Sequence, residues 1–154
     1  MNYDDFLLPG QAEFEKLAKA YSSQKRSMIA LENPDINPAI LDSICYSLKY
    51  LNWLYTYIKR NLRNNKLRSV FENFAKQTDL DFIEIEKRFY GEPKIIKLTK
   101  SKRLNSLNSC VRLAIYSEAE LVENMINLFK CGNFEFAEPI IFNHIEYIKK
   151  LSTI

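Results

Sequence analysis

The segment from Asn37 to Leu62 constrains the fold more than any other part of the chain, because it predicts one helix with two apolar faces. The first face is a stripe of residues spaced three and four apart, which is the spacing that an α-helix turns toward a partner helix. Its members are Leu41, Ile44, Leu48, Leu51, Tyr55, Ile58 and Leu62. The second face is an aromatic stripe that lies roughly 200° around the same helix. Its members are Tyr46, Tyr50, Trp53 and Tyr57. Such a helix is buried in a bundle or shared with another subunit, so the other segments must pack around it.

Three further segments show helical periodicity. They run from Leu67 to Tyr90, from Leu104 to Leu128, and along a final stripe of Ala137, Ile141, His144, Ile148 and Leu151. The earlier segment from Gln11 to Glu32 predicts an amphipathic helix that we expect to cover the aromatic stripe. Only 3 glycines and 5 prolines occur in 154 residues, which favours long helices and short connections. We therefore predict a single all-α domain, in which residues 37–154 form an antiparallel bundle of four main helices and residues 1–36 form an N-terminal arm with a lid helix.

Local signals predict where these helices begin and end. Asn37-Pro38 supplies an N-cap residue followed by proline at the first helical position, so the central helix begins there. Asn64-Asn65 predicts a tight turn into the next helix, and Gly91 is typical of a helix C-terminus. Pro139 either opens the last helix or kinks it. The basic segment 94–103 predicts a loop or the start of the third helix, with at most a few residues of strand.

Charge and cysteine content indicate the class and location of the protein. The 22 Lys and Arg against 19 Asp and Glu give a net charge of +3, which is too small to indicate nucleic-acid binding. Cys45, Cys110 and Cys131 have no metal-binding spacing, so we expect reduced thiols in a cytoplasmic protein, with the first two packed as small apolar residues. No hydrophobic run approaches the roughly 20 residues that cross a bilayer, so we expect no membrane segment.

Four polar residues interrupt the apolar stripes where a bundle core is expected. They are Thr78, Asp81, Glu118 and His144, and they come from three different helices. Sites in helix bundles are built from such inward-facing side chains. A charged carboxylate in a core needs a cation, a metal or a hydrogen-bond donor, and His144, the only histidine, is a candidate partner for Glu118. The alternatives are that the stripes are misassigned by one residue and these groups are exposed, or that they form one satisfied structural pair.

These segments resemble the ferritin-like and rubrerythrin-like superfamily of four-helix bundles. The similarity lies in residues Leu41 to Gly91, with Leu67 to Ala75 (LRSVFENFA) opening the second helix, and in Ala114 to Glu118 (AIYSE) on the third. It covers most of residues 39–151 and consists mainly of apolar spacing.

The resemblance implies a core site, but most of the family's ligands are missing. That family binds two irons through a glutamate on the first helix, Glu-x-x-His on the second, a glutamate on the third and Glu-x-x-His on the fourth. At the matching positions this chain has Leu48, then Thr78 and Asp81, then Glu118, then Ile141 and His144. These donors do not rebuild a di-iron cage, so we expect no metal and no cofactor. A reduced metal or redox site at Glu118, His144 and Asp81 is the alternative.

Two surface features are the other candidate sites. Basic residues near the helix ends would bind phosphate or an acidic protein if they cluster, and otherwise form a solvated surface that complements helix C-termini. The anion-binding candidates are Arg60, Arg63, Lys66, Lys97, Lys100, Lys102 and Arg103. The aromatic stripe is a candidate protein interface, because aromatic side chains bury a large area and keep a polar tip. Its alternative cover is the N-terminal helix.

The sequence favours a non-enzymatic protein without settling the question. It contains no Gly-rich phosphate loop and no G-x-S-x-G motif, and we identify no catalytic residue. We expect a helical interaction or regulatory module that acts through protein–protein contacts, with another protein or a second copy of itself as partner. The alternatives are a metal-binding or redox ferritin-like bundle and, less favoured, a nucleic-acid binder that uses the basic ends.

Overall fold

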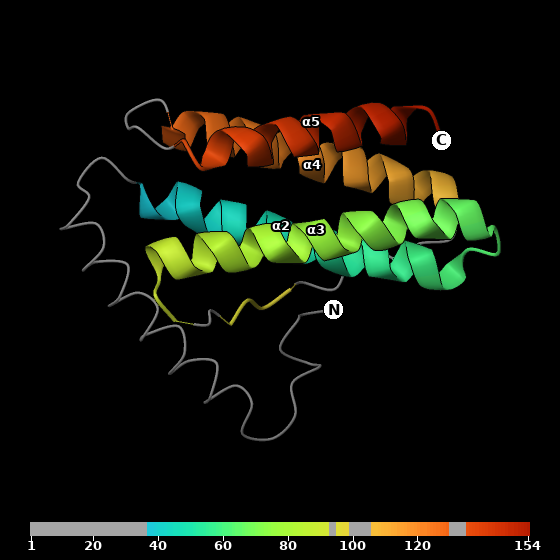
Figure 1. The fold of residues 1–154 in the computed structure, drawn as a ribbon, viewed down its shortest axis with the longest axis horizontal. Coiled ribbons are helices and arrows are strands. Elements are labelled where there is room, and N and C mark those ends of the chain that lie inside the picture. The colour runs from blue at the N-terminus through green and yellow to red at the C-terminus, as the bar shows by residue number, and fades with distance from the viewer. Residues whose placement is uncertain (1–36, 93–94, 99–105, 130–134) are drawn as a thin grey trace, which may run out of the picture.

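The computed structural model describes residues 37–92, 95–98, 106–129 and 135–154, and these residues form four long helices without a strand (Figure 1). Helix α2 spans Pro38–Asn61, α3 spans Asn65–Phe89, α4 spans Leu107–Phe129 and α5 spans Ala137–Ser152. The predicted all-α bundle is confirmed for this part of the chain. The predicted lid helix, and Leu104 at the expected start of the third helix, lie outside the described residues.

The central helix begins and the second helix ends as the local signals indicate. The side chain of Asn37 accepts a hydrogen bond from the backbone N–H of Ala39 at 2.9 Å, and Pro38 occupies the first turn of α2. After α3, the backbone N–H of Gly91 donates to the carbonyl of Glu86 at 3.0 Å. Gly91 has a φ of 67°, in the left-handed region that glycine adopts without steric cost.

The other two predicted helix starts are refined by the structure. The side chain of Asn64 accepts from the backbone N–H groups of Lys66 and Leu67 at 3.0 and 3.1 Å. This capping starts α3 at Asn65, two residues before the predicted Leu67. Pro139 lies in the first turn of α5, where a missing N–H leaves no helical hydrogen bond unmade, so it opens the helix.

Neighbouring helices in the bundle are antiparallel (Figure 1). Helix α2 packs against α3 and α4, and α5 packs against α4 and α3. The ring centroids of Phe74 and Tyr147 are 4.4 Å apart, and those of Phe89 and Phe136 are 5.9 Å apart. Because the later residue of α3 meets the earlier residue of the α5 region, α3 and α5 run in opposite directions. Helices α3 and α4 therefore run in the same direction, and residues 90–106 connect opposite ends of the bundle. This long crossover differs from the short connections that we predicted.

The apolar stripes form the core, with two corrections on α5. Every member of the α2 stripe is buried except Leu62, which packs against the core partly exposed. The predicted Ile148 is only half-buried. Ile140 is buried in place of the predicted Ile141, which is also half-buried. Both positions are apolar, so only the rotation of α5 against its neighbours decides between them. None of the described helices has the length and hydropathy needed to cross a membrane.

Candidate functional site

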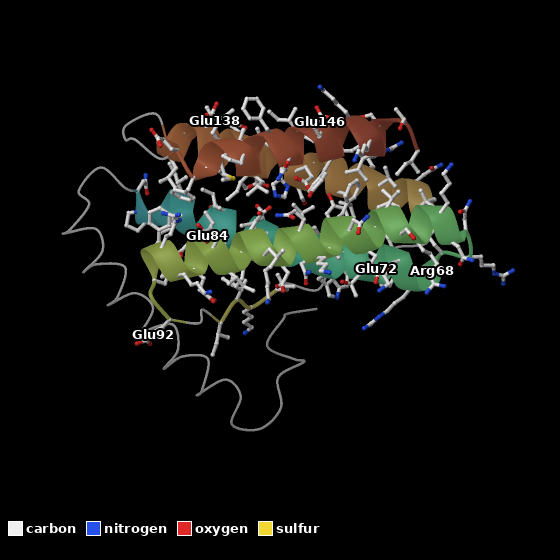
Figure 2. All side chains as sticks on the ribbon, viewed as in Figure 1. Arg68, Glu72, Glu84, Glu92, Glu138 and Glu146 are labelled. Atoms are coloured by element: carbon white, nitrogen blue, oxygen red, sulfur yellow. The ribbon has the colours of Figure 1, made fainter. Side chains whose placement is uncertain are left out.

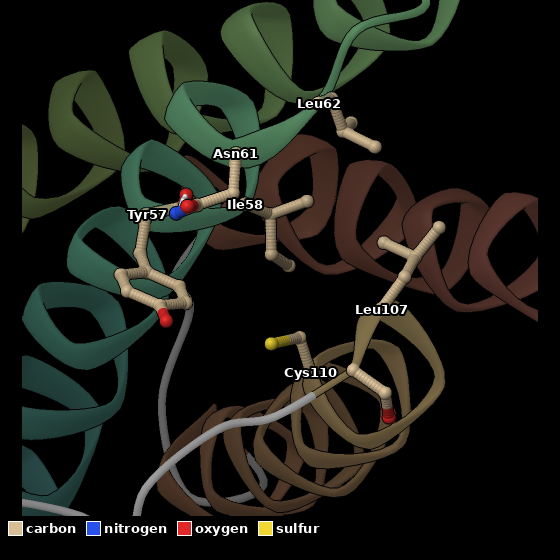
Figure 3. A pocket seen from close by; sticks show the side chains of 7 residues that line it. Tyr57, Ile58, Asn61, Leu62, Leu107 and Cys110 are labelled. Atoms are coloured by element: carbon tan, nitrogen blue, oxygen red, sulfur yellow. Dashed lines mark hydrogen bonds between the residues drawn. The ribbon is translucent and has the colours of Figure 1, made fainter.

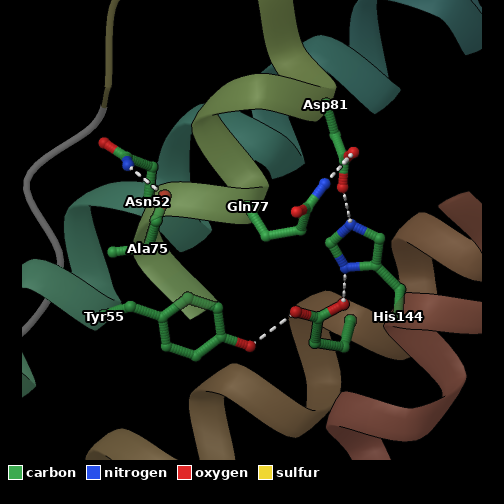
Figure 4. A network of polar contacts seen from close by, with 7 residues as sticks. Asn52, Tyr55, Ala75, Gln77, Asp81 and His144 are labelled. Carbon is green, nitrogen blue, oxygen red and sulfur yellow. Dashed lines mark hydrogen bonds and ion pairs between the residues drawn. The ribbon is translucent and has the colours of Figure 1, made fainter. Parts of the chain in front are cut away.

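The polar residues that interrupt the stripes meet at the centre of the bundle (Figure 4). Asp81 comes from α3, Glu118 from α4 and His144 from α5, and Tyr55 of α2 joins them. Glu118 and His144 are 0% exposed and Asp81 is 4% exposed, so the alternative in which these groups face solvent is wrong. Together with Gln77 of α3, these side chains are termed the core network.

His144 lies between the two carboxyl groups. Its Nδ1 is 2.6 Å from Oε2 of Glu118, and its Nε2 is 2.9 Å from Oδ2 of Asp81. The hydroxyl of Tyr55 donates to Oε1 of Glu118 at 2.5 Å, and Nε2 of Gln77 donates to Oδ1 of Asp81 at 3.1 Å. The hydrogen bonds therefore run without a break from α2 through α4 and α5 to α3 (Figure 4).

This geometry requires one proton beyond a neutral imidazole and two carboxylates. Both ring nitrogens of His144 face a carboxyl oxygen, whereas a neutral imidazole has one donor nitrogen and an ionised carboxylate only accepts. Burial lowers the pKa of His144, but the hydrogen bonds from Asp81 and Glu118 and their negative charges outweigh it and raise that pKa to about 9. The imidazolium therefore carries the extra proton at neutral pH.

Two tyrosines beside this cation are held neutral. Burial raises the pKa of Tyr55 well above its ordinary value, and the charge and hydrogen bond of Glu118 raise it further. Burial and, to a smaller extent, the charges of Asp81 and Glu118 also raise the pKa of Tyr147. The ring of Tyr147 is edge-on to that of His144, with 5.1 Å between the ring centroids. Both phenols remain protonated at neutral pH, so they act as donors or packing surfaces and not as bases.

The core network does not fit a metal ion in the way that the ferritin-like resemblance implies. An ion at either ring nitrogen of His144 would meet one carboxyl group and have the other behind the imidazole. The described part of the chain contains no group of three or more His, Cys, Asp or Glu residues placed to hold a metal ion. Thr78 is fully buried, and its hydroxyl has no hydrogen-bond partner among the described residues. Its neutral oxygen does not replace a missing carboxylate.

The structure brings together only part of the predicted anion-binding set. Arg60, Arg63 and Lys66 lie where α2 ends and α3 begins, and all three are exposed. Lys97 lies on the crossover between α3 and α4 and is half-buried. The remaining candidates, Lys100, Lys102 and Arg103, lie outside the described residues.

The aromatic stripe forms one continuous ladder along α2. Its ring centroids are 6.4 Å apart from Tyr46 to Tyr50, 5.9 Å from Tyr50 to Trp53, and 5.7 Å from Trp53 to Tyr57. The tyrosines are half-buried, and Trp53 is 41% exposed. This aromatic ladder is therefore a second face of α2, separate from the face that contributes Tyr55 to the core network. Residues 11–32, which we expect to cover the ladder, lie outside the described residues.

A pocket of about 210 Å³ opens between the end of α2 and the start of α4 (Figure 3). Its lining consists of Tyr57, Ile58, Asn61, Leu62, Ser106, Leu107 and Cys110. The sulfur of Cys110 points into this space (Figure 3), and burial raises the pKa of its thiol, which disfavours the reactive thiolate. Cys45 and Cys110 are buried as predicted, whereas Cys131 lies outside the described residues.

Sequence reasoning missed two members of the core network. Tyr55 reads as one member of an apolar stripe, yet its hydroxyl is a usable signal, because a buried hydroxyl nearly always has a partner. Gln77 stands one helical turn before Asp81 and reaches its carboxyl group along α3. The spacing on α3 makes this second pairing possible, but nothing in the sequence selects it.

Comparisons with protein-family models, with curated proteins and with solved structures find no match to this chain. The ferritin-like resemblance therefore stays a prediction from the sequence. The function has to be argued from the surfaces and the network described above.

Proposed function

We propose that the protein is a non-enzymatic helical interaction module of the cytoplasm, and that it binds a protein partner through the aromatic ladder. The observation that carries this proposal is the exposure of Trp53, at 41%, within a row of stacked rings. Exposed tryptophan and tyrosine are enriched at protein interfaces and dominate their binding energy.

The position of the ladder on α2 suits it to this role. The opposite face of α2 is packed into the core, where Leu48 and Leu51 are fully buried, so the ladder stands on a rigid support. Stacked aromatic rings lose little conformational entropy when they bind, which favours affinity. A partner of matching chemistry would present an apolar surface to Trp53 and hydrogen-bonding groups to the tyrosine hydroxyls.

The core network supports a non-enzymatic role. Both nitrogens of His144, the hydroxyl of Tyr55 and the amide of Gln77 are engaged with other side chains of the network. No substrate atom can approach groups that are buried and already paired. We therefore interpret the network as a structural one, whose hydrogen bonds link the four helices. Neither Cys45 nor Cys110 forms a disulfide, which is in keeping with a reducing compartment.

The test replaces Trp53 by alanine in the full-length protein. Phe142→Ala is the matched control, because Phe142 is an exposed aromatic residue, 59% exposed, on α5 and outside the ladder. A partner isolated with the wild-type protein should bind the Phe142→Ala variant equally and lose at least about tenfold in affinity for Trp53→Ala, which corresponds to about 1.4 kcal/mol. Equal binding by all three proteins would refute the assignment of this face.

The fluorescence of Trp53 provides an independent measurement, because it is the only tryptophan in the chain. Adding the purified partner should shift its emission to the blue and protect it from quenching by acrylamide. Deleting residues 1–32 separates this contact from cover by the N-terminal segment. If that segment is the cover, the deletion should shift the emission to the red in the absence of partner.

A further inference from the structure

Helices α4 and α5 together form one outer face of the bundle, on the side away from α2 and α3 (Figure 1). Tyr116 of α4 is 67% exposed and Phe142 of α5 is 59% exposed, more than any other large hydrophobic residue in the described part of the chain. Each stands two residues before a buried residue of the core network, Glu118 or His144, so helical register points it about 200° away from the core. Ile126, 44% exposed, extends the apolar surface along α4. This surface is termed the α4–α5 face, and its aromatic residues are typical of a protein interface.

Four charged side chains flank the aromatic residues on this face. They are Arg112 and Glu123 of α4 and Glu138 and Lys149 of α5, and all four are exposed. Cys110 of α4 lines the pocket against α2, and Tyr147 of α5 packs against α3, so the other sides of these two helices turn toward each other. Helical register places the four charges on those sides, about 120–140° around from the buried residue of the core network. Figure 2 shows Glu138 on this side of the bundle.

Little within the described bundle neutralises these four charges. Lys149 lies 3.0 Å from Glu146, but the pair is exposed and such pairs contribute little. The other three side chains have no ion pair with a described residue. The same register turns the remaining exposed charges of the two helices toward α2 or α3, and these are Glu120, Glu146 and Lys150.

The basic residues of the face lie on one side of the core network. Glu118 and His144 mark one level of the antiparallel pair, because Oε2 of the first is 2.6 Å from Nδ1 of the second. Arg112 stands six residues before Glu118, and a helix rises 1.5 Å per residue, so it lies about 9 Å from that level. Lys149 stands five residues after His144, which places it about 8 Å from the level in the same direction.

The acidic residues lie equally far on the other side. Glu123 stands five residues after Glu118, and Glu138 stands six residues before His144, so both are about 8–9 Å from the level of the core network. A rotation by 180° about an axis at this level, in the plane of the face and perpendicular to the helices, therefore exchanges the acidic and the basic positions. The two exposed aromatic residues lie within about 3 Å of the level, at the centre of this symmetric pattern.

We propose that two copies of this chain bind through their α4–α5 faces as a symmetric dimer, in which α4 and α5 each lie antiparallel to the same helix of the partner subunit. Arg112 then faces Glu123 of the partner subunit, and Lys149 faces Glu138 of the partner subunit. A two-fold axis parallel to the helices would instead place basic residues against basic residues, which charge repulsion disfavours. Tyr116 and Phe142 form the apolar centre of the contact, and the charges around them set its register.

The size of the face indicates a reversible dimer. Helix α5 has 16 residues and is about 24 Å long, and two packed helices are about 20 Å wide. An area of this size is at the low end for a specific interface, so we expect a dissociation constant on the order of 1–100 µM.

Sedimentation velocity of the full-length protein between about 1 and about 300 µM spans this range of dissociation constants. The weight-average mass should rise with concentration from the monomer value of 18.2 kDa toward twice that value. Phe142→Ala removes a ring from the centre of the contact and should raise the dissociation constant at least about tenfold. Trp53→Ala alters the aromatic ladder on α2 and should dimerise like the wild type.

A charge exchange on α4 tests the register. Arg112→Glu and Glu123→Arg each place like charges opposite each other in the dimer, so each alone should raise the dissociation constant at least about tenfold. The double variant restores opposite charges between the copies and should return to within about threefold of the wild type. The two positions are about 16 Å apart along α4, so this rescue requires a second copy. Lys76→Glu, an exposed charge on α3, is the control and should dimerise like the wild type, and circular dichroism checks that every variant keeps its helix content.

Three results would overturn the proposal. A wild-type protein that stays monomeric at about 300 µM excludes a dimer of the expected affinity. A monomeric Trp53→Ala variant would show that the copies meet through the aromatic ladder instead. A double variant that dimerises as weakly as the single variants would exclude the antiparallel register. Phe142→Ala and the charge variants leave the ladder intact, so their results leave the proposed function to its own test.

Discussion

The core network should make the protein less stable as pH rises from 6.5 to 9. The pKa of His144 is raised from the ordinary value of 6.5 to about 9 in the folded protein, because its imidazolium is held between Asp81 and Glu118. A proton bound more tightly in the folded state stabilises that state. This stabilisation is complete below pH 6.5, where His144 is protonated in both states, and it is lost as pH rises through 9, where the folded state also loses the proton.

The size of the effect follows from the same two values. One pKa unit corresponds to about 1.4 kcal/mol, so the difference between 6.5 and about 9 contributes about 3 kcal/mol to the free energy of unfolding at low pH. About 2 kcal/mol of it should disappear between pH 7 and pH 9. Solvent does not screen this interaction, because His144 is fully buried. The loss is large against a typical total stability of about 5–15 kcal/mol.

Two measurements check this prediction. Urea unfolding followed by circular dichroism at intervals from pH 6 to pH 9 gives the free energy of unfolding directly. Nuclear magnetic resonance gives the protonation of His144 without ambiguity, because the chain has only one histidine. The ring signals should titrate near pH 9, and Asp81→Asn should move that midpoint down by removing one negative partner. A midpoint near 6.5 in the wild type, or a stability that stays constant from pH 7 to pH 9, would refute the reasoning.

Three further changes test individual contacts by urea unfolding at pH 7. Tyr55→Phe removes the donor to the core network and should lower the free energy of unfolding by about 1.5–3 kcal/mol, whereas Tyr116→Phe, on the surface of α4, should change it by less than about 0.5 kcal/mol. Thr78→Val replaces a buried hydroxyl without a partner, so stability should stay constant or rise, and a loss above about 1 kcal/mol would contradict the described contacts. Asn64→Ala removes the N-cap of α3 and should cost about 1 kcal/mol, whereas an equal loss for Asn65→Ala would argue against capping.

The helices and their ends could be predicted because they depend on neighbours in the sequence. Asn37 caps α2 through a hydrogen bond to Ala39, two residues away, and Pro38 suits a first turn whatever lies around it. Where the burial of a residue depended on packing between helices, the prediction was wrong. Ile140 and Ile141 are both apolar, and the packing of α5 against α3 and α4 buries the first.

The core network was only partly predictable. Asp81, Glu118 and His144 stand out in the sequence because helical periodicity places them on apolar stripes, and the cost of burying a charge indicates that Glu118 needs a partner. That argument leads to His144. It does not reveal that one imidazole serves two carboxyl groups, or that Tyr55 supplies the donor on the other side of Glu118.

The sequence by itself determined the helical periods, the caps and the polar interruptions, since each depends on residues within a few positions of one another. The tertiary structure decided which helices become neighbours. Tyr55 and Glu118 are separated by 63 residues, and so are Asp81 and His144. Their hydrogen bonds exist only because α4 begins at the end of the bundle opposite to the end of α3 and lies antiparallel to α2, with α5 beside both α3 and α4. Local propensity does not specify which helices become neighbours, because that arrangement depends on how the four apolar faces are buried against one another.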